Sequence, residues 1–378
     1  MMPEIYMKWG SYMNKPLSIR QAVLMYLFIS ISPVLRQIPS ALAKEAGRSG
    51  YISPIWATFP VLILTAIIIL LINSYPGLNL YEITVQLTGK VFAKFIMIFY
   101  LIWAILYLTG ILNAYALSLQ FTLMPKTGSD FFIQVMIILA IYALYKTAKT
   151  IFRFSEFALG PVFAFIGILF ICALNRLRTD YLIPVSAINL PNTLKASINV
   201  TAVGGNIFLI LFFADRFGLS VTKKHLRKFW TGALIFILLN LVITIFTYGI
   251  TGAPLTANLP FPFYITVKSI TFFNIFERFE VLVTLVCILS DYVSVCIMFI
   301  IVLHIIRWLF GIEEKEFLII PVAMVVYYLT FLVSRTQFEY DFFYKHVIVN
   351  LNLIFLYILP LFICFLCLLK RKYIRKQY

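Results

Sequence analysis

The stretch Ile31-Ser32-Pro33-Val34-Leu35-Arg36-Gln37-Ile38-Pro39 interrupts the first apolar segment of the chain with two prolines. The sixth apolar segment is interrupted in a corresponding place by Gly204-Gly205. Broken helices expose backbone N–H and C=O groups, which a bilayer tolerates only where they face protein or a polar cavity. Paired breaks of this kind are typical of transporter-like inverted repeats, whose binding site lies at the breaks. The two stretches therefore predict discontinuous helices one and six, with a small-ligand or ion site between them.

The composition predicts an all-α integral membrane protein. Hydrophobic residues make up 62% of the 378 residues and charged residues only 12%, and the mean hydropathy is +0.97, values far from those of a soluble domain. A membrane-spanning helix needs about 20 mostly apolar residues, and ten such stretches fill the chain. We place these ten spans at about 18–46, 52–75, 94–122, 129–147, 155–175, 197–217, 228–251, 277–309, 317–334 and 346–369.

The predicted organisation is a cytoplasmic N-terminal segment at 1–17, a ten-helix transmembrane domain at 18–369 and a basic cytoplasmic tail at 370–378. Twenty of the 31 Lys and Arg residues lie on the side of the two termini. Because Lys and Arg near span ends are retained in the cytoplasm, both termini are expected there. The net charge of +16 is explained by clusters that face anionic lipid headgroups of the bilayer, so we expect no nucleic-acid partner.

Enzyme and metal-site signatures are missing from the sequence. The three histidines lie far apart, without the His-Glu-x-x-His pattern of zinc enzymes, and no nucleophile elbow of the Gly-x-Ser-x-Gly type occurs. The five cysteines fall inside predicted spans, where they usually pack as small apolar residues. We therefore expect no catalytic residue, no cofactor and no metal.

The few polar or helix-breaking residues inside the spans are the candidate site residues, because a charge at mid-bilayer is costly unless it is paired or wet. All of them except Asp291 are interpreted as ligand-binding, and Glu280 and Asp291 as coupling or gating residues. They are Ser32, Pro33, Arg36 and Gln37 in span one, Asn113 in span three, Thr201, Gly204, Gly205 and Asn206 in span six, and Glu280, Thr284 and Asp291 in span eight. Tyr107 and Tyr115 of span three are interpreted as ordinary interior aromatics.

These residues also have structural alternatives. Pro33 could simply kink its helix, and the two glycines of span six could serve close helix packing. Glu280 could form a structural ion pair with Arg278 or Arg36. Asp291 has no obvious local partner, and a hydrogen-bonded packing role is as plausible for it as a functional one.

Several short stretches occur in the order found in a known family. They are Leu17-Ser18-Ile19-Arg20-Gln21, the stretch from Ile38-Pro39-Ser40 to Ala46-Gly47-Arg48, Tyr75-Pro76-Gly77 with the segment through Gly89-Lys90, and Glu277-Arg278-Phe279-Glu280. In these the chain resembles the spore germination permease family, the B-subunit of bacterial spore germinant receptors, within the amino acid–polyamine–organocation superfamily. The resemblance runs from about residue 15 to the end.

This resemblance implies a five-plus-five inverted-repeat fold with a pocket between spans one, three, six and eight. It also implies a small nutrient germinant as ligand, often an amino acid, A- and C-type receptor subunits as partners, and a place in the spore inner membrane. Relatives often carry an acidic residue after the glycine of span six, where this chain has Asn206.

Three functions are open from the sequence. The leading one is a non-enzymatic sensor, in which a germinant docks at the broken helices and shifts a conformational equilibrium. The second is an amino acid transporter coupled to H⁺ or Na⁺ through Glu280 or Asp291. The third is a subunit of an ion-conducting germination channel.

Overall fold

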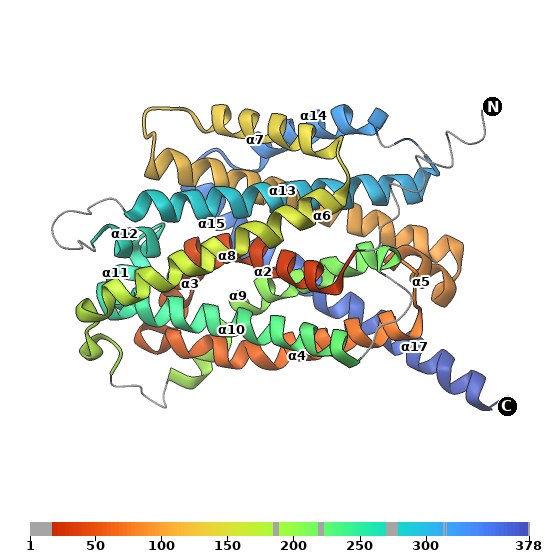
Figure 1. Cartoon of the computed structure of the whole chain (residues 1–378), viewed down its shortest axis with the longest axis horizontal. Coiled ribbons are helices and arrows are strands. Elements are labelled where there is room, and N and C mark those ends of the chain that lie inside the picture. The colour runs from red at the N-terminus through yellow and green to blue at the C-terminus, as the bar shows by residue number, and fades with distance from the viewer. Residues whose placement is uncertain are drawn as a thin grey trace.

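Helices run side by side along the length of the molecule in the computed structural model, which describes residues 17–183, 189–217, 223–269, 279–312, 314 and 316–376 (Figure 1). These residues contain no strand, and their only β-type pairing is a bridge between Leu17 and Phe217. The start of α2 and the end of α17 lie toward one end of the bundle, whereas α11 and α12 lie at the other (Figure 1).

Among the described residues, eight α-helices precede residue 205, with the 3-10 turn η1 after the second of them. They are α2 (Ile19–Arg36), α3 (Ile38–Ala46), the 3-10 turn η1 (Gly47–Ile52), α4 (Ser53–Ser74), α5 (Leu80–Thr88), α6 (Lys90–Thr122), α7 (Ser129–Leu144), α8 (Ala148–Ala173) and α9 (Leu190–Gly204). The second half of the chain contains the 3-10 segment η5 (Gly205–Arg216), α10 (Lys223–Thr251), α11 (Ala253–Asn258), α12 (Pro262–Lys268), α13 (Phe279–Phe310) and α14 (Glu316–Val333). The last span is built from α15 (Gln337–Phe343), the π-helical turn η6 (Tyr344–Ile348), α16 (Val349–Leu353), the π-helical turn η7 (Ile354–Ile358) and α17 (Leu359–Lys376).

Nine helical segments of the described residues are long and apolar enough to cross a membrane. Every one overlaps the predicted spans, and the segment Ile38–Ser74 joins the end of the first predicted span to the second. The prediction of an all-α integral membrane protein is thus confirmed over this part of the chain. The remaining prediction, a span at 129–147, falls on α7, which has 16 residues. At 1.5 Å per residue such a helix is about 24 Å long, shorter than the roughly 30 Å hydrocarbon core of a bilayer.

Spans one and six lie at the centre of the bundle. Their most apolar windows are 78% and 89% buried inside the protein, against 22% for α14. In Figure 1, α7 and α14 form one edge of the molecule, and α4 and α17 lie at the opposite edge. The central helices therefore have little contact with lipid, and their polar residues face protein.

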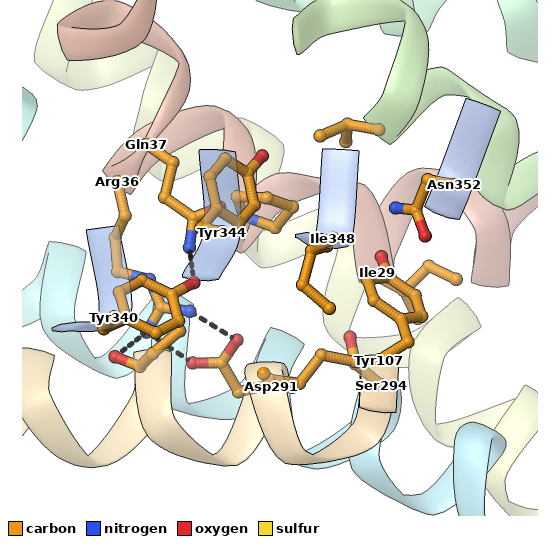
Figure 2. A pocket seen from close by; sticks show the side chains of 15 residues that line it. Ile29, Arg36, Gln37, Tyr107, Asp291, Ser294, Tyr340, Tyr344, Ile348 and Asn352 are labelled. Atoms are coloured by element: carbon orange, nitrogen blue, oxygen red, sulfur yellow. Dashed lines mark hydrogen bonds and ion pairs between the residues drawn. The ribbon is translucent and has the colours of Figure 1, made fainter. Parts of the chain in front are cut away.

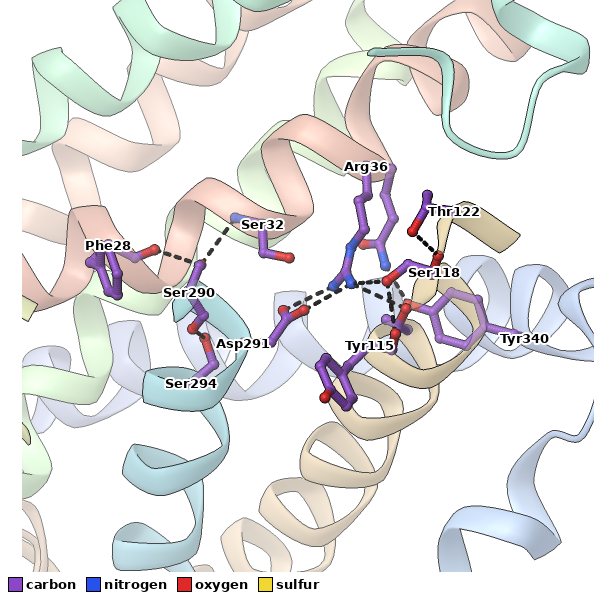
Figure 3. A network of polar contacts seen from close by, with 12 residues as sticks. Phe28, Ser32, Arg36, Tyr115, Ser118, Thr122, Ser290, Asp291, Ser294 and Tyr340 are labelled. Carbon is purple, nitrogen blue, oxygen red and sulfur yellow. Dashed lines mark hydrogen bonds and ion pairs between the residues drawn. The ribbon is translucent and has the colours of Figure 1, made fainter. Parts of the chain in front are cut away.

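The first span is discontinuous, as predicted, but in two steps. The separation between α2 and α3 falls at Gln37, which caps both helices. One turn earlier Ser290 of α13 is inserted into the backbone ladder of α2: the Ser32 amide donates to Ser290 Oγ at 3.1 Å, and Ser290 Oγ donates to the Phe28 carbonyl at 2.7 Å (Figure 3). Pro33 lacks an N–H and so provides no donor for the next carbonyl, that of Ile29. Insertion of a side chain and a proline are both recognised causes of a kink.

The sixth span changes its winding where the glycines lie, without an unwound gap. Gly204 has φ −58° and ψ −26°, and Gly205 has φ −58° and ψ −21°, so both are helical. The α-helix α9 passes at this point into twelve residues of 3-10 helix in η5, a long run for this tighter helix type. The sequence located the transition correctly, but the prediction that the backbone is open there is wrong.

Candidate functional site

A buried ion pair joins α2 to α13 near the centre of the bundle. The Arg36 Nη2 atom lies 2.9 Å from Asp291 Oδ1, and Nη1 lies 2.8 Å from Asp291 Oδ2. Arg36 is 6% exposed and Asp291 2%. The pairing that the sequence left open for Arg36, with Glu280, is therefore wrong, and Asp291 does have a partner, supplied by a helix distant in sequence. Neutralising both charges in this way is what permits them at this depth.

The third span completes the coordination of Arg36. Its Nη1 atom donates to the Ala114 carbonyl at 3.1 Å and to Ser118 Oγ at 2.9 Å, as Figure 3 shows for Ser118 and Asp291. The Nε atom of Arg36 is buried and has no hydrogen-bond partner among the described residues. The guanidinium is held by two helices and still has one donor to offer.

This ion pair lies in the wall of a small internal cavity (Figure 2). The cavity has a volume of about 40 Å³, which is enough for on the order of one to three water molecules. Its walls come from spans one, three, six, eight and ten. The lining residues are Ile29, Pro33, Arg36 and Gln37 of α2 and its cap, Tyr107, Gly110, Ile111 and Ala114 of α6, Val203 of α9, Asp291 and Ser294 of α13, and Tyr340, Tyr344, Ile348 and Asn352 of the last span.

The wall from the last span was missed by sequence reasoning. Tyr340, Tyr344, Ile348 and Asn352 recur every four residues, which places them on one face of a helix. That spacing is visible in the sequence, but the predicted span began at residue 346, whereas the apolar helix begins at Gln337. The first two tyrosines therefore lie outside the predicted span. Tyr107 likewise lines the cavity, so the interpretation of this residue as an ordinary interior aromatic is incomplete.

A hydrogen bond separates this cavity from a larger, more open one, which we call the vestibule. Gln37 Nε2 donates to the hydroxyl of Tyr340, and both residues, with Tyr344, line the two cavities. The vestibule has a volume of about 350 Å³. Its charged residues are paired, with Lys345 Nζ 2.7 Å from Glu45 Oε1 and Lys44 Nζ 3.8 Å from Asp341 Oδ2. The Gln37–Tyr340 contact thus lies between a charged vestibule and the buried ion pair.

Of the predicted site residues, the structure places Pro33, Arg36, Gln37 and Asp291 together around the cavity. The others lie outside its lining. Ser32 is one residue away and contributes its amide to the Ser290 bridge. Glu277 and Arg278, which entered the family resemblance, lie outside the described residues.

The glycines of span six are packing residues in this structure. A Cβ atom at Gly204 would lie 2.6 Å from Cγ2 of Val61, and one at Gly205 would lie 2.8 Å from Cβ of Leu356. Real Cβ contacts are not that short, so only glycine fits between these helices. The packing alternative therefore describes both positions, and their neighbour Val203 provides the cavity wall.

Three further predicted residues hold helices together. Asn113 Nδ2 donates to the Thr330 carbonyl at 3.0 Å, and the Thr201 carbonyl accepts from the Tyr357 hydroxyl at 2.7 Å. Asn206 Oδ1 accepts from the Tyr107 hydroxyl at 2.9 Å. Tyr107 lines the cavity, so Asn206 orients a lining side chain without lining the cavity itself.

Glu280 and Thr284 lie on the other side of Arg36. Thr284 and Arg36 share a second, smaller cavity of about 20 Å³, and Thr284 Oγ1 donates to the Glu280 carbonyl at 3.1 Å. Glu280 is 8% exposed, and its Oε2 atom has no hydrogen-bond partner in the described part of the chain. This carboxylate is separate from the ion pair.

The arrangement is suited to binding rather than to bond breaking. It presents a cation, an anion and several hydroxyl and amide groups to one enclosed space, but no nucleophile held beside a general base. Within the described ranges, no group of three or more His, Cys, Asp or Glu could hold a metal ion.

Comparison with known proteins gave one match. The model of a family described as spore germination protein matches residues 16–338, which is most of the chain. A search of the curated proteins found no match.

Proposed function

Because the chain belongs to the spore germination protein family, we propose that it is the membrane subunit of a germinant receptor and that it binds a small nutrient, an amino acid, at Arg36 and Asp291. The observation that carries this proposal is the buried ion pair in the wall of an internal cavity. It supports a ligand that carries two opposite charges close together.

An amino acid zwitterion can replace this internal ion pair without leaving a charge unpaired. Its carboxylate would accept from the guanidinium of Arg36, including the unpartnered Nε, and its ammonium would donate to the carboxylate of Asp291. A simple amine or a simple acid would leave one protein charge buried without a partner, which is costly. The geometry therefore favours zwitterions over ligands with a single charge.

The size of the cavity couples binding to a change of shape. A space of about 40 Å³ holds waters but not an amino acid, so the ligand binds only to a more open conformation. The contact between Gln37 and Tyr340 lies on the route from the vestibule and would have to break. A ligand that binds the open conformation alone shifts the equilibrium toward it, which is how a receptor without enzymatic activity can signal.

The same proposal extends to the architecture and its setting. We place α7 as a tenth, short spanning helix and interpret the fold as a five-plus-five inverted repeat, supported by the central positions of spans one and six. The excess of Lys and Arg at the end where α2 starts and α17 ends favours cytoplasmic termini. A- and C-type receptor subunits and the spore inner membrane are the expected partners and location.

We expect zwitterionic amino acids to raise the thermal unfolding midpoint of the purified protein, and singly charged analogues of the same size not to. A ligand at one hundred times its Kd stabilises the native state by about 2.7 kcal/mol. The measurement is a thermal shift with a panel of amino acids, in which alanine, for example, is compared with ethylamine and propionate. Stabilisation by the amine or the acid alone would contradict binding at the ion pair.

Replacing Tyr340 with Phe should make the receptor more sensitive. The substitution removes the hydroxyl that accepts from Gln37, and a hydrogen bond of this kind contributes about 1 kcal/mol. Opening then costs less, and the germinant concentration for half-maximal germination should fall about fivefold. Tyr328→Phe is the matched control, since that side chain lies on the exposed outer face of α14. Equal sensitivity of the two variants, at equal protein levels, would exclude a gating role for this contact.

The buried Oε2 atom of Glu280, which has no hydrogen-bond partner among the described residues, favours one second function, a coupled amino acid transporter, because a buried acid is suited to carrying a proton. Uptake of labelled amino acid into proteoliposomes separates the two functions. A receptor shows saturable binding without accumulation, and a transporter shows accumulation that Glu280→Gln abolishes.

A further inference from the structure

A fourth cavity lies at the opposite end of the bundle from the vestibule, between the α7–α8 connection, the end of η5 and the last turns of α13. It has a volume of about 290 Å³. Its apolar lining residues are Leu144, Ala148, Ile300 and Leu303, and its polar lining residues are Lys146, Thr147, Arg216, His304, Arg307, Glu314 and Glu316. It shares no residue with the cavity beside Asp291.

Two arginines line this cavity, and the nearest carboxylate to act on either is that of Asp215, the exposed chain neighbour of Arg216. Arg216 Nη2 lies 3.2 Å from His304 Nε2, and Arg307 Nε donates to the Ile312 carbonyl at 3.1 Å. Neither guanidinium forms an ion pair with a carboxylate in the described part of the chain. Both side chains are half-buried, so water screens their charges less than it would at the surface.

The acidic residues of the cavity do not cancel this charge. Glu314 and Glu316 are exposed, where water and salt weaken their effect on buried groups. The half-buried charged side chains of the lining, Arg216 and Arg307, are both cationic. The half-buried part of the cavity is therefore positive.

The surroundings place this cavity at the level of a bilayer surface. Lys94, near the start of α6, donates from Nζ to the Leu309 carbonyl at 2.9 Å, and the Arg216 carbonyl accepts from the Leu17 amide at 2.8 Å. Both contacts lie where spanning helices begin or end, on the side that the distribution of Lys and Arg predicts to be cytoplasmic. Anionic headgroups gather at such surfaces, and basic pockets between spanning helices bind them.

We propose that this cavity is a phosphate-binding site, in which Arg216 and Arg307 hold the phosphate group. The planar fork of a guanidinium matches two phosphate oxygens, and two forks on one cavity can hold a single phosphate from two sides. The group could belong to an anionic phospholipid or to soluble phosphate. The apolar floor formed by Ile300 and Leu303 suits the first source, since it offers a surface to an acyl chain.

The test measures the thermal unfolding midpoint of the full chain in phosphatidylcholine nanodiscs, in nanodiscs containing phosphatidylglycerol, and in detergent with added inorganic phosphate. Stabilisation by phosphatidylglycerol alone assigns a lipid headgroup, and stabilisation by phosphate in detergent assigns a soluble anion. No stabilisation over phosphatidylcholine and over chloride at equal ionic strength would overturn the proposal.

Substitutions test whether the stabilisation arises from anion binding in this cavity. The double variant Arg216→Gln/Arg307→Gln should lose the stabilisation, whereas Arg153→Gln, which removes an exposed arginine of α8 outside the cavity, should keep it. If the double variant does not fold, Arg307→Lys retains the charge without the fork and should weaken binding about tenfold, the effect of one charged hydrogen bond. Full stabilisation of Arg307→Lys and of the double variant would show that the anion binds elsewhere.

Discussion

Asp291→Asn should lower the free energy of unfolding by about 3–5 kcal/mol, the largest effect that we expect from a single substitution in this protein. The variant leaves Arg36 charged and buried without a counter-ion, bonded only to neutral groups such as the Ala114 carbonyl and the Ser118 hydroxyl. Removing one member of a buried ion pair is costly because the other member keeps its full desolvation penalty. The measurement is the unfolding transition of the purified protein in detergent.

A second variant separates stability from binding. Replacing both charges by apolar residues, as in Arg36→Met/Asp291→Val, removes the unpaired charge and should recover most of the lost stability. The same double variant should bind no amino acid, because both anchoring charges are gone. Glu156→Gln is the control, since it removes a carboxylate from an exposed pair with Arg20 and should change stability by less than about 1 kcal/mol. Amino acid binding by the double variant would refute the assignment of the site.

Gly205→Ala should destabilise the protein by about 1–3 kcal/mol, the usual cost of an extra group in a packed core. The added Cβ would lie 2.8 Å from Cβ of Leu356, an atom fixed to its own backbone, so the last span has to move away from η5. This displacement reaches the cavity wall, because Ile348 and Asn352 are on the same span. A lower unfolding midpoint together with weaker amino acid binding is the expected result.

Gly167→Ala is the matched comparison. This glycine lies within α8, and a Cβ atom there meets nothing within 4 Å. Since alanine is the better helix former by about 1 kcal/mol, the variant should be as stable as the parent or slightly more so. If the two glycine variants behave alike, the close packing of span six against the last span is not what constrains Gly205.

The helical frame could be predicted from sequence because it depends on local composition. Runs of about 20 apolar residues located the apolar spanning helices of the described residues, but they did not show how short α7 is or how early the last helix begins. The position of the break in span one was also readable, since Pro33 removes a donor wherever it occurs in a helix. The sequence around Pro33 does not reveal that the adjacent amide, that of Ser32, donates to Ser290 of another helix.

The candidate site was only partly predictable, for the same reason. Arg36 and Asp291 could each be selected as charges inside a span, but their pairing depends on how α2 and α13 lie against each other, which no local pattern encodes. The two glycines of span six could be recognised as unusual from the sequence. A glycine required for close helix packing and a glycine required for ligand contact look the same in a sequence, however. Tyr340 and Tyr344 are absent from the predicted site residues because the last helix begins earlier than its apolar run suggests.

The hydroxyl of Ser290 gives α2 two equivalent ways of satisfying its backbone. With Ser290 in place, the Ser32 amide and the Phe28 carbonyl are each bonded through it; if α13 withdrew, the same two groups could bond directly to each other as in any α-helix. Straightening the helix would thus exchange one set of hydrogen bonds for another rather than break them. Movement of α13, which also carries Asp291, would then meet little resistance from the backbone it leaves behind.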